Sequence, residues 1–158
     1  MQIFIDRKKA FTLVEIMVVL LIVSLLASLA IPQMLRSRMN ANETAAIGAM
    51  RHISNSCQVY YNNVSPHTYP PNGLSDLTPP ASNPSYINTR LAAAINAASA
   101  KQGYYYVYTL IDSETFTLLG RPSRPNRTGV RIFYINEIGV MTYTTDGTDP
   151  GPNSLIVQ

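Results

Sequence analysis

The stretch that decides the fold is RKKAFTLVEIMVVLLIVSLLASLAIP, residues 7–32. Its basic start is followed by the 21 residues Phe11–Ile31, in which Glu15 is the only charged side chain. As an α-helix with a rise of roughly 1.5 Å per residue, this run is about 31 Å long, which is enough to cross the hydrocarbon core of a bilayer. A carboxylate costs up to about 3 kcal/mol at the centre of a membrane helix, so the presence of Glu15 requires an explanation.

A secretory signal peptide and a simple membrane anchor each explain only part of this segment. A signal peptide has an apolar stretch of about 7–15 residues, followed by small residues at the cleavage site. Here the stretch is longer, and the small residue Ala10 precedes it. A membrane anchor accounts for the length, and the positive-inside rule would keep the basic residues 7–9 on the cytoplasmic side. An anchor alone leaves Glu15 unexplained.

The string Phe11-Thr-Leu-Val-Glu15 behind a short basic leader resembles the type IV pilin-like family, the subunits of bacterial type IV pili and of type II secretion pseudopili. The resemblance implies that residues 1–10 are a leader peptide. A prepilin peptidase would cut between Ala10 and Phe11 and then methylate the new amine of Phe11. Residues 11–35 would form a transmembrane helix that later becomes the filament core. The family usually has Gly at the position of Ala10, and many pilins have Gly at the position of Ser24.

Glu15 and Pro32 are the residues of this helix to which the resemblance gives a role in assembly. Glu15 falls in the first turn of the processed helix, where the macrodipole favours negative charge. In the family this carboxylate pairs with the terminal amine of a neighbouring subunit, here that of Phe11. Because an unpaired charge is costly in apolar surroundings, only a correctly staggered neighbour satisfies it. The alternative is a polar residue tolerated near the membrane surface. Pro32 lacks a backbone donor and is expected to kink the helix.

Residues 36–158 are expected to form one globular head, which begins with a helix over residues 36–61. Apolar residues recur there at spacings of three, four and seven, which is typical of a helix with one packing face. They are Met39, Ala46, Met50, Ile53, Cys57, Tyr60 and Val64. Arg36, Arg38, Asn42, Glu43 and Arg51 are placed mostly off this stripe.

The rest of the head is predicted to be a loop region followed by a small sheet. Residues 62–103 are rich in proline and predict a long loop, with a turn of helix near Leu74–Leu77 and a short helix over Leu91–Ala98 capped by Asn88 or Thr89. A period of two then predicts a sheet over residues 104–144, as an antiparallel meander. Its four strands are Tyr104–Ile111, Thr115–Gly120, Val130–Asn136 and Val140–Thr144, and residues 145–158 are expected to form a C-terminal loop. The fold class is therefore α+β: a long N-terminal helix packed on about four strands, as in the pilin fold.

Composition argues against several classes of function. The chain has 158 residues, a formal net charge of +3 and a single cysteine, Cys57. Residues 1–10 carry +2 of this charge, so the overall charge does not indicate nucleic acid. One cysteine excludes an intramolecular disulfide, and Cys57 lies in the helical pattern as a small apolar residue. His52 and His67 lack partners at metal-ligand spacing, and no catalytic or nucleotide-binding motif occurs. We therefore expect neither an enzyme nor a cofactor.

Two weaker candidate sites lie towards the C-terminus. Asp146, Asp149 and Asn153 offer oxygen ligands of the kind that Ca²⁺ prefers, in a loop that loosely resembles the calcium loop of major pseudopilins. Asp-Gly and Pro-Gly are also ordinary turn residues. Four arginines cluster on one turn and the following strand and would suit the phosphates of DNA: Arg121, Arg124, Arg127 and Arg131. The alternatives are a solvated turn, or pairing with Glu137 or with acids of a neighbouring subunit.

The sequence therefore predicts a structural subunit of a bacterial type IV pilus, processed by prepilin peptidase and polymerised through its N-terminal helix. The alternatives are a type II secretion pseudopilin, or a minor pilin that binds DNA or a surface at the filament tip. The expected partners are other copies of the chain, the inner membrane before assembly, the peptidase and methylase, and the pilus assembly machinery. We expect a single-pass inner-membrane protein that becomes an extracellular surface filament with a role in adhesion or motility.

Overall fold

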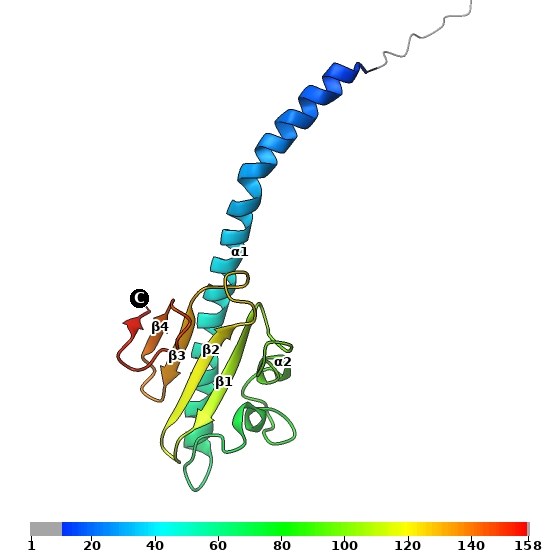
Figure 1. The fold of residues 1–158 in the computed structure, drawn as a ribbon. Coiled ribbons are helices and arrows are strands. Elements are labelled where there is room, and N and C mark those ends of the chain that lie inside the picture. The colour runs from blue at the N-terminus through cyan, green and yellow to red at the C-terminus, as the bar shows by residue number, and fades with distance from the viewer. Residues whose placement is uncertain (1–10, 158) are drawn as a thin grey trace, which may run out of the picture. The chain divides into compact units, whose positions relative to one another are not determined.

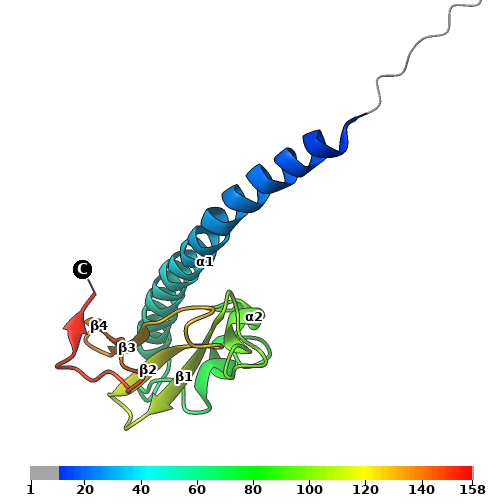
Figure 2. The same ribbon diagram turned by 45° about the horizontal axis from the view of Figure 1, so that its top comes forward.

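The computed structural model describes residues 11–157, which fall into two units, residues 11–36 and residues 37–157. We call the first unit the N-terminal segment and the second the head. The predicted leader, residues 1–10 with Ala10 and the basic cluster, lies outside the described residues. Figure 1 and Figure 2 show the elements of both units.

The helix α1 spans Leu13–Asn63 and is continuous through Ser24 and Pro32. It contains a window long and apolar enough to cross a membrane. The hydroxyl groups of Ser24 and Ser28 donate to the carbonyls of Leu20 and Leu25, both at 2.7 Å, so these polar groups are satisfied within the helix. Pro32 has no N–H to donate to the carbonyl four residues earlier. The kink at Pro32 stays a prediction.

In the head, one face of α1 packs on an antiparallel sheet, whose strands cross this part of the helix in Figure 1. The middle of the predicted stripe is buried: Ala46, Met50, Ile53 and Cys57 are each at most 1% exposed. Facing them are buried residues of the strands: Tyr104, Tyr106, Phe116, Leu118 and Phe133. Gly120 permits the close approach of helix and sheet, because a Cβ there would lie 2.5 Å from the Met50 sulfur.

The sheet is a sequential meander in the order β1-β2-β3-β4-β5. The strands are β1 (Tyr104–Leu110), β2 (Phe116–Pro122), β3 (Ile132–Asn136), β4 (Met141–Thr144) and β5 (Leu155–Ile156). The register pairs Tyr106 with Gly120, Gly120 with Phe133, and Phe133 with Tyr143. Between α1 and β1 lie the 3-10 helix η1 (Gly73–Leu77) and the short helix α2 (Thr89–Ala92). The Asn88 side chain caps α2 by accepting from the Arg90 N–H, as the sequence predicts.

The α+β class and the antiparallel meander are confirmed, while two details of the prediction are wrong. The sheet has a fifth strand, β5, inside the region predicted as a C-terminal loop. This strand has two residues and is too short to show a period. The short helix ends at Ala92 instead of Ala98. Its chain leaves the helix because the carbonyl of Ala94 accepts from the Tyr106 N–H at 2.7 Å.

Candidate assembly and surface sites

Thr12 and Glu15 form a reciprocal cap at the N-terminus of α1. The Glu15 N–H donates to the Thr12 hydroxyl at 3.2 Å, and the Thr12 N–H donates to a Glu15 carboxylate oxygen at 3.5 Å. This is the capping-box arrangement, which satisfies two backbone donors that have no partner in the helix. Sequence reasoning missed the cap, although the Thr-x-x-Glu spacing is its usual signal.

The side chains that follow this cap are apolar and exposed. The large apolar side chains from Phe11 to Leu35 are each at least 48% exposed. Leu13 and Leu29, for example, are 75% and 73% exposed. A soluble monomer rarely exposes a contiguous apolar surface of this size, and one this large marks contact with a membrane or with other protein. Glu15 is itself exposed, so its carboxylate can accept further hydrogen bonds beside the cap.

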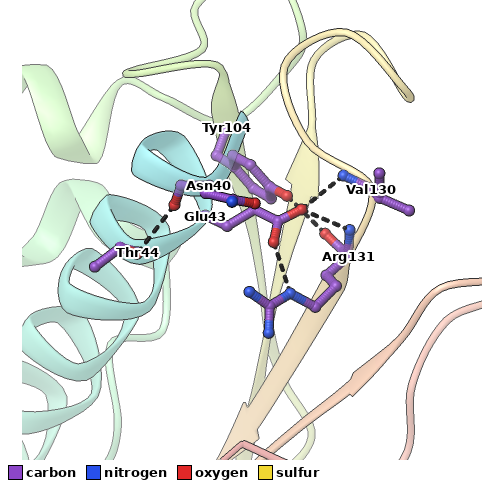
Figure 3. A network of polar contacts seen from close by, with 6 residues as sticks. All are labelled: Asn40, Glu43, Thr44, Tyr104, Val130 and Arg131. Carbon is purple, nitrogen blue, oxygen red and sulfur yellow. Dashed lines mark hydrogen bonds and ion pairs between the residues drawn. The ribbon is translucent and has the colours of Figure 1, made fainter. Parts of the chain in front are cut away.

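Within the head, Glu43 is a buried carboxylate that ties α1 to the start of β3. It is 4% exposed and accepts from the Val130 N–H at 2.8 Å, the Arg131 N–H at 3.1 Å and Arg131 Nε at 2.6 Å. Figure 3 shows these three bonds converging on the carboxylate from one strand end. Burial raises the pKa of Glu43, but these hydrogen bonds and the Arg131 charge outweigh it, so the pKa is lowered overall.

Sequence reasoning placed Glu43 among the polar residues off the stripe, which is wrong. The spacing indicates that Glu43 belongs to the stripe, because it follows Met39 by four residues and precedes Ala46 by three. A carboxylate at a stripe position needs a cation or several donors. Its partner Arg131 is 88 residues away, so no local pattern identifies it.

The loop between β2 and β3, residues 123–131, is held by further contacts with α1 and with the first residue of β1. The Asn42 amide donates to the Thr128 carbonyl at 2.9 Å, and the Tyr104 hydroxyl donates to the Arg131 carbonyl at 2.8 Å. Gly129 packs directly on Tyr104, since a Cβ at that position would lie 2.1 Å from the hydroxyl oxygen. We call this segment the clasped loop.

The four arginines of the predicted DNA-binding cluster lie on β2, the clasped loop and its junction with β3, but they differ in their contacts. Arg131 pairs with Glu43 and lies 5.5 Å and 5.4 Å from the ring centres of Phe133 and Tyr143. Arg121 forms an ion pair with Asp149. Arg124 and Arg127 are exposed on the clasped loop. The sequence also suggested Glu137 as a partner of these arginines. The contact recorded for Glu137 is made by its backbone carbonyl, which accepts from the Gln58 amide at 2.8 Å.

Two of the three predicted calcium ligands, Asp146 and Asp149, have protein partners. Asp149 pairs with Arg121, and Asn153 is exposed. One Asp146 carboxylate oxygen accepts from the Thr148 hydroxyl at 2.6 Å and from the Thr148 N–H at 3.0 Å, and these bonds lower the pKa of Asp146. Across residues 11–157, no group of three or more His, Cys, Asp or Glu side chains is placed to hold a metal ion. Calcium binding stays a prediction.

The remaining reactive side chains make ordinary contacts. Cys57 is fully buried, and burial raises the pKa of its thiol to about 12, so it is protonated at neutral pH. His52 contacts the Ser56 hydroxyl at 3.4 Å, and His67 contacts the Tyr61 carbonyl at 2.9 Å. The histidines lie on α1 and on the loop that follows it, and each contacts a neighbour close to it in the sequence.

Comparison with known proteins gives partial matches. Residues 5–31 match the model of the prokaryotic N-terminal methylation motif. Over 65 residues the chain is 34% identical to type II secretion system core protein G of Escherichia coli (strain K12), a match that covers 41% of this chain and 43% of that relative. No solved structure matches the chain. The motif and the partial relative together support a type IV pilin-like protein, a pilin or pseudopilin. Pilins and pseudopilins are structural proteins, and the apolar helix with the methylation motif supports membrane anchoring of this chain.

Proposed function

We propose that this chain is a structural subunit of a bacterial type IV pilus, which polymerises through its N-terminal helix. The observation that carries the proposal is the exposed apolar helix surface between Phe11 and Leu35. Each CH₂ group exposed to water costs about 0.8 kcal/mol, so outside a bilayer this surface would be stable only when packed against the helices of neighbouring subunits. Before assembly the same surface suits a single span of the inner membrane.

Processing would occur between Ala10 and Phe11, followed by methylation of the Phe11 amine. The match to the methylation motif over residues 5–31 supports this step. Cleavage there would leave the new amine one residue before the Thr12 cap, and a methylated amine keeps its positive charge. Intact-mass measurement of assembled subunits would show a chain beginning at methylated Phe11. An assembled chain beginning at Met1 would contradict the processing step.

Glu15 would set the stagger between subunits by accepting the Phe11 amine of a neighbour. The capping contact is compatible with this role, because a carboxylate has acceptor sites for several donors. The charge and the cap can be separated by substitution. Glu15→Gln keeps an acceptor for the Thr12 N–H but removes the charge, while Thr12→Ser keeps both.

We expect Glu15→Gln to enter the membrane normally and to yield few or no filaments, and Thr12→Ser to assemble like the wild type. Membrane fractionation and electron microscopy of sheared filaments measure the two steps separately. Assembly of Glu15→Gln at wild-type levels would show that the ion pair does not set the stagger.

A second candidate function is that of a type II secretion pseudopilin, and the similarity to protein G favours it. The two functions predict different structures at the cell surface when the gene is expressed at its native level. A pilus subunit would give long surface filaments that disappear when the gene is deleted. A pseudopilin would give no such filaments, and deletion would instead stop the secretion of specific proteins.

A further inference from the structure

We propose that the head carries two complementary surfaces, an acidic end and a basic end, and that the acidic end of one copy binds the basic end of the next copy. The acidic end consists of Asp112, Glu114 and Glu137, and the basic end consists of Arg124 and Arg127. The inference rests on the proposed function, because it names a contact between heads within the polymer. This contact adds to those of the N-terminal helix and does not replace them.

The meander brings the three acidic residues to one end of the sheet. Asp112 and Glu114 lie in the turn between β1 and β2, and Glu137 begins the turn between β3 and β4. β2 and β3 are neighbours, and their register pairs Thr117 with Asn136. Because Glu137 directly follows the paired Asn136, the two acidic turns lie next to each other.

The clasped loop, which carries Arg124 and Arg127, lies at the opposite end of the sheet. It joins the end of β2 to the start of β3, so the seven residues of β2 separate it from the acidic turns by about 20 Å. Figure 1 shows the turn between β1 and β2 and the clasped loop at opposite ends of the strands. The Arg127 N–H donates to the Arg124 carbonyl at 3.1 Å, which keeps the two residues in one turn.

The charged groups at both ends are free to bind an external partner. The salt bridges within residues 37–157 join Arg121 to Asp149 and Arg131 to Glu43. Neither of these pairs includes a residue of the acidic or the basic end. The five side chains of the two ends are all at least partly exposed.

Positive and negative side chains are separated along the sheet. Residues 105–120 and 132–157 contain no Lys or Arg, so the acidic turns have no cation in their own strands. Asp146 follows β4 on the side of the basic end, but its carboxylate is already bound by the hydroxyl and the N–H of Thr148. Opposite charges on two separate surfaces of one chain favour contact between unlike ends and oppose contact between like ends.

Exposed apolar side chains beside the charges favour a protein partner over nucleic acid. Ile111 and Ile138, in the two acidic turns, are 64% and 74% exposed, and Val130, in the clasped loop, is 38% exposed. Protein interfaces combine such apolar contacts with a polar rim. A contact between two different surfaces of the same chain can repeat from copy to copy, as a filament requires. A few exposed ion pairs contribute little by themselves, so isolated heads should stay monomeric.

Reversal of the charges tests the contact in the full chain. Within the part of the chain that the structure describes, the side chains of four of these residues make no hydrogen bond, so their substitution should leave the turns intact: Glu114, Glu137, Arg124 and Arg127. We expect Glu114→Lys with Glu137→Lys to lower the yield of sheared filaments about tenfold, because like charges then face each other. Arg124→Glu with Arg127→Glu should have the same effect. All four changes together should restore the yield to within about twofold of the wild type.

The matched control is Arg51→Glu with Arg90→Glu, which reverses two exposed positive charges elsewhere in the head. We expect this control to assemble like the wild type. An equal loss of filaments in the control would show that total charge matters and would overturn the contact between the two ends. Loss in the Arg124 and Arg127 variant alone, with normal assembly of the acidic variant, would overturn it in favour of another partner for the basic end.

Cross-linking tests the same contact without depending on long filaments. Glu114→Cys with Arg127→Cys in one chain places a thiol at each end of the sheet, and the native Cys57 is fully buried. A short bis-maleimide added to membranes of cells that produce this chain should give a ladder of dimers, trimers and larger products. A chain with either new cysteine alone should give no ladder.

The possible results separate this inference from the proposed function. Filaments of normal yield from both charge-reversed variants, or a loss that the four combined changes do not restore, would overturn the contact and leave polymerisation through the N-terminal helix intact. Absence of filaments from the wild type would overturn the proposed pilus. The cross-linking would then decide the contact alone, and the absence of a ladder would overturn it.

Discussion

Glu43 is a buried acid whose three donors come from two adjacent residues of one strand end. Replacing it with Ala would leave the Val130 and Arg131 N–H groups and a partly buried guanidinium without their acceptor. We expect Glu43→Ala to lower the free energy of unfolding of the head by about 3 kcal/mol. Denaturant unfolding followed by circular dichroism measures this change. Asp112→Ala, which removes an exposed acid from a turn, should change it much less.

The lowered pKa of Glu43 also predicts a dependence on pH. A group whose pKa is lower in the folded state stabilises the fold above its unfolded pKa, which is near 4.5 for this group. That stabilisation is lost as the pH falls through the folded value. The stability difference between the wild type and Glu43→Gln should therefore be largest at neutral pH and shrink in acid. A difference that stays constant between pH 7 and pH 3 would contradict the ionised state of Glu43.

At the scale of elements, the contact between α1 and the sheet depends on a small residue in β2. A Cβ on Gly120 would lie 2.5 Å from the buried Met50 sulfur, so Gly120→Ala forces the helix or Met50 to shift. We expect a loss of about 1–3 kcal/mol in the free energy of unfolding. Gly48→Ala is the matched control, because nothing lies within 4 Å of a Cβ there and α1 should gain up to about 1 kcal/mol. Equal effects of the two changes would show that the interface is loosely packed.

The elements that the sequence predicted correctly are those with a clear local period. The stripe from Ala46 to Cys57 identified the buried face of α1, and alternation identified β1 to β4. The short strand β5 was missed because two residues carry no period. The end of α2 was misplaced because the bond from Tyr106 to the Ala94 carbonyl joins distant segments. Such pairings depend on the tertiary fold and leave no mark in the local sequence.

The candidate sites also differ in whether a local sequence pattern or a tertiary contact defines them. The N-terminal motif from Phe11 to Glu15 is contiguous and could be read directly from the sequence. Clustering in the sequence grouped four arginines, whereas tertiary contacts divide them into two that pair with acids and two that stay exposed. Neither Glu43 nor Asp149 could be assigned to its arginine, because 88 and 28 residues separate the partners.

At the scale of the whole molecule, the two units should be separable. The head has its own core, formed by one face of α1 and the sheet, and none of that core comes from residues 11–36. We expect a fragment beginning at Arg36 to be soluble, monomeric and folded, with both helix and sheet in its circular dichroism spectrum. Light scattering measures its mass. The full chain should require detergent or lipid under the same conditions, and an aggregated fragment would contradict an independent head.

Removal of divalent metal should leave the thermal stability of this fragment unchanged. Asp149 is held by Arg121 and Asp146 by Thr148, so the C-terminal loop is fixed by contacts within the protein. We expect the Tm of the head to be the same with EDTA and with added Ca²⁺. A Tm that falls by several degrees with EDTA and recovers with Ca²⁺ would show that metal binding stabilises the folded state, as expected for a calcium-dependent pseudopilin.

The sheet narrows from seven paired positions between β1 and β2 to two between β4 and β5. Proteolytic loss of Leu155 and Ile156 would therefore break only the two pairings that join β5 to β4. Their loss would leave the backbone groups of Thr142 and Tyr143 unpaired, and β4 would become an open strand. Open strands pair readily with strands of other molecules. Leu155 and Ile156 thus cover the outer edge of β4, and their loss is expected to promote aggregation of the head.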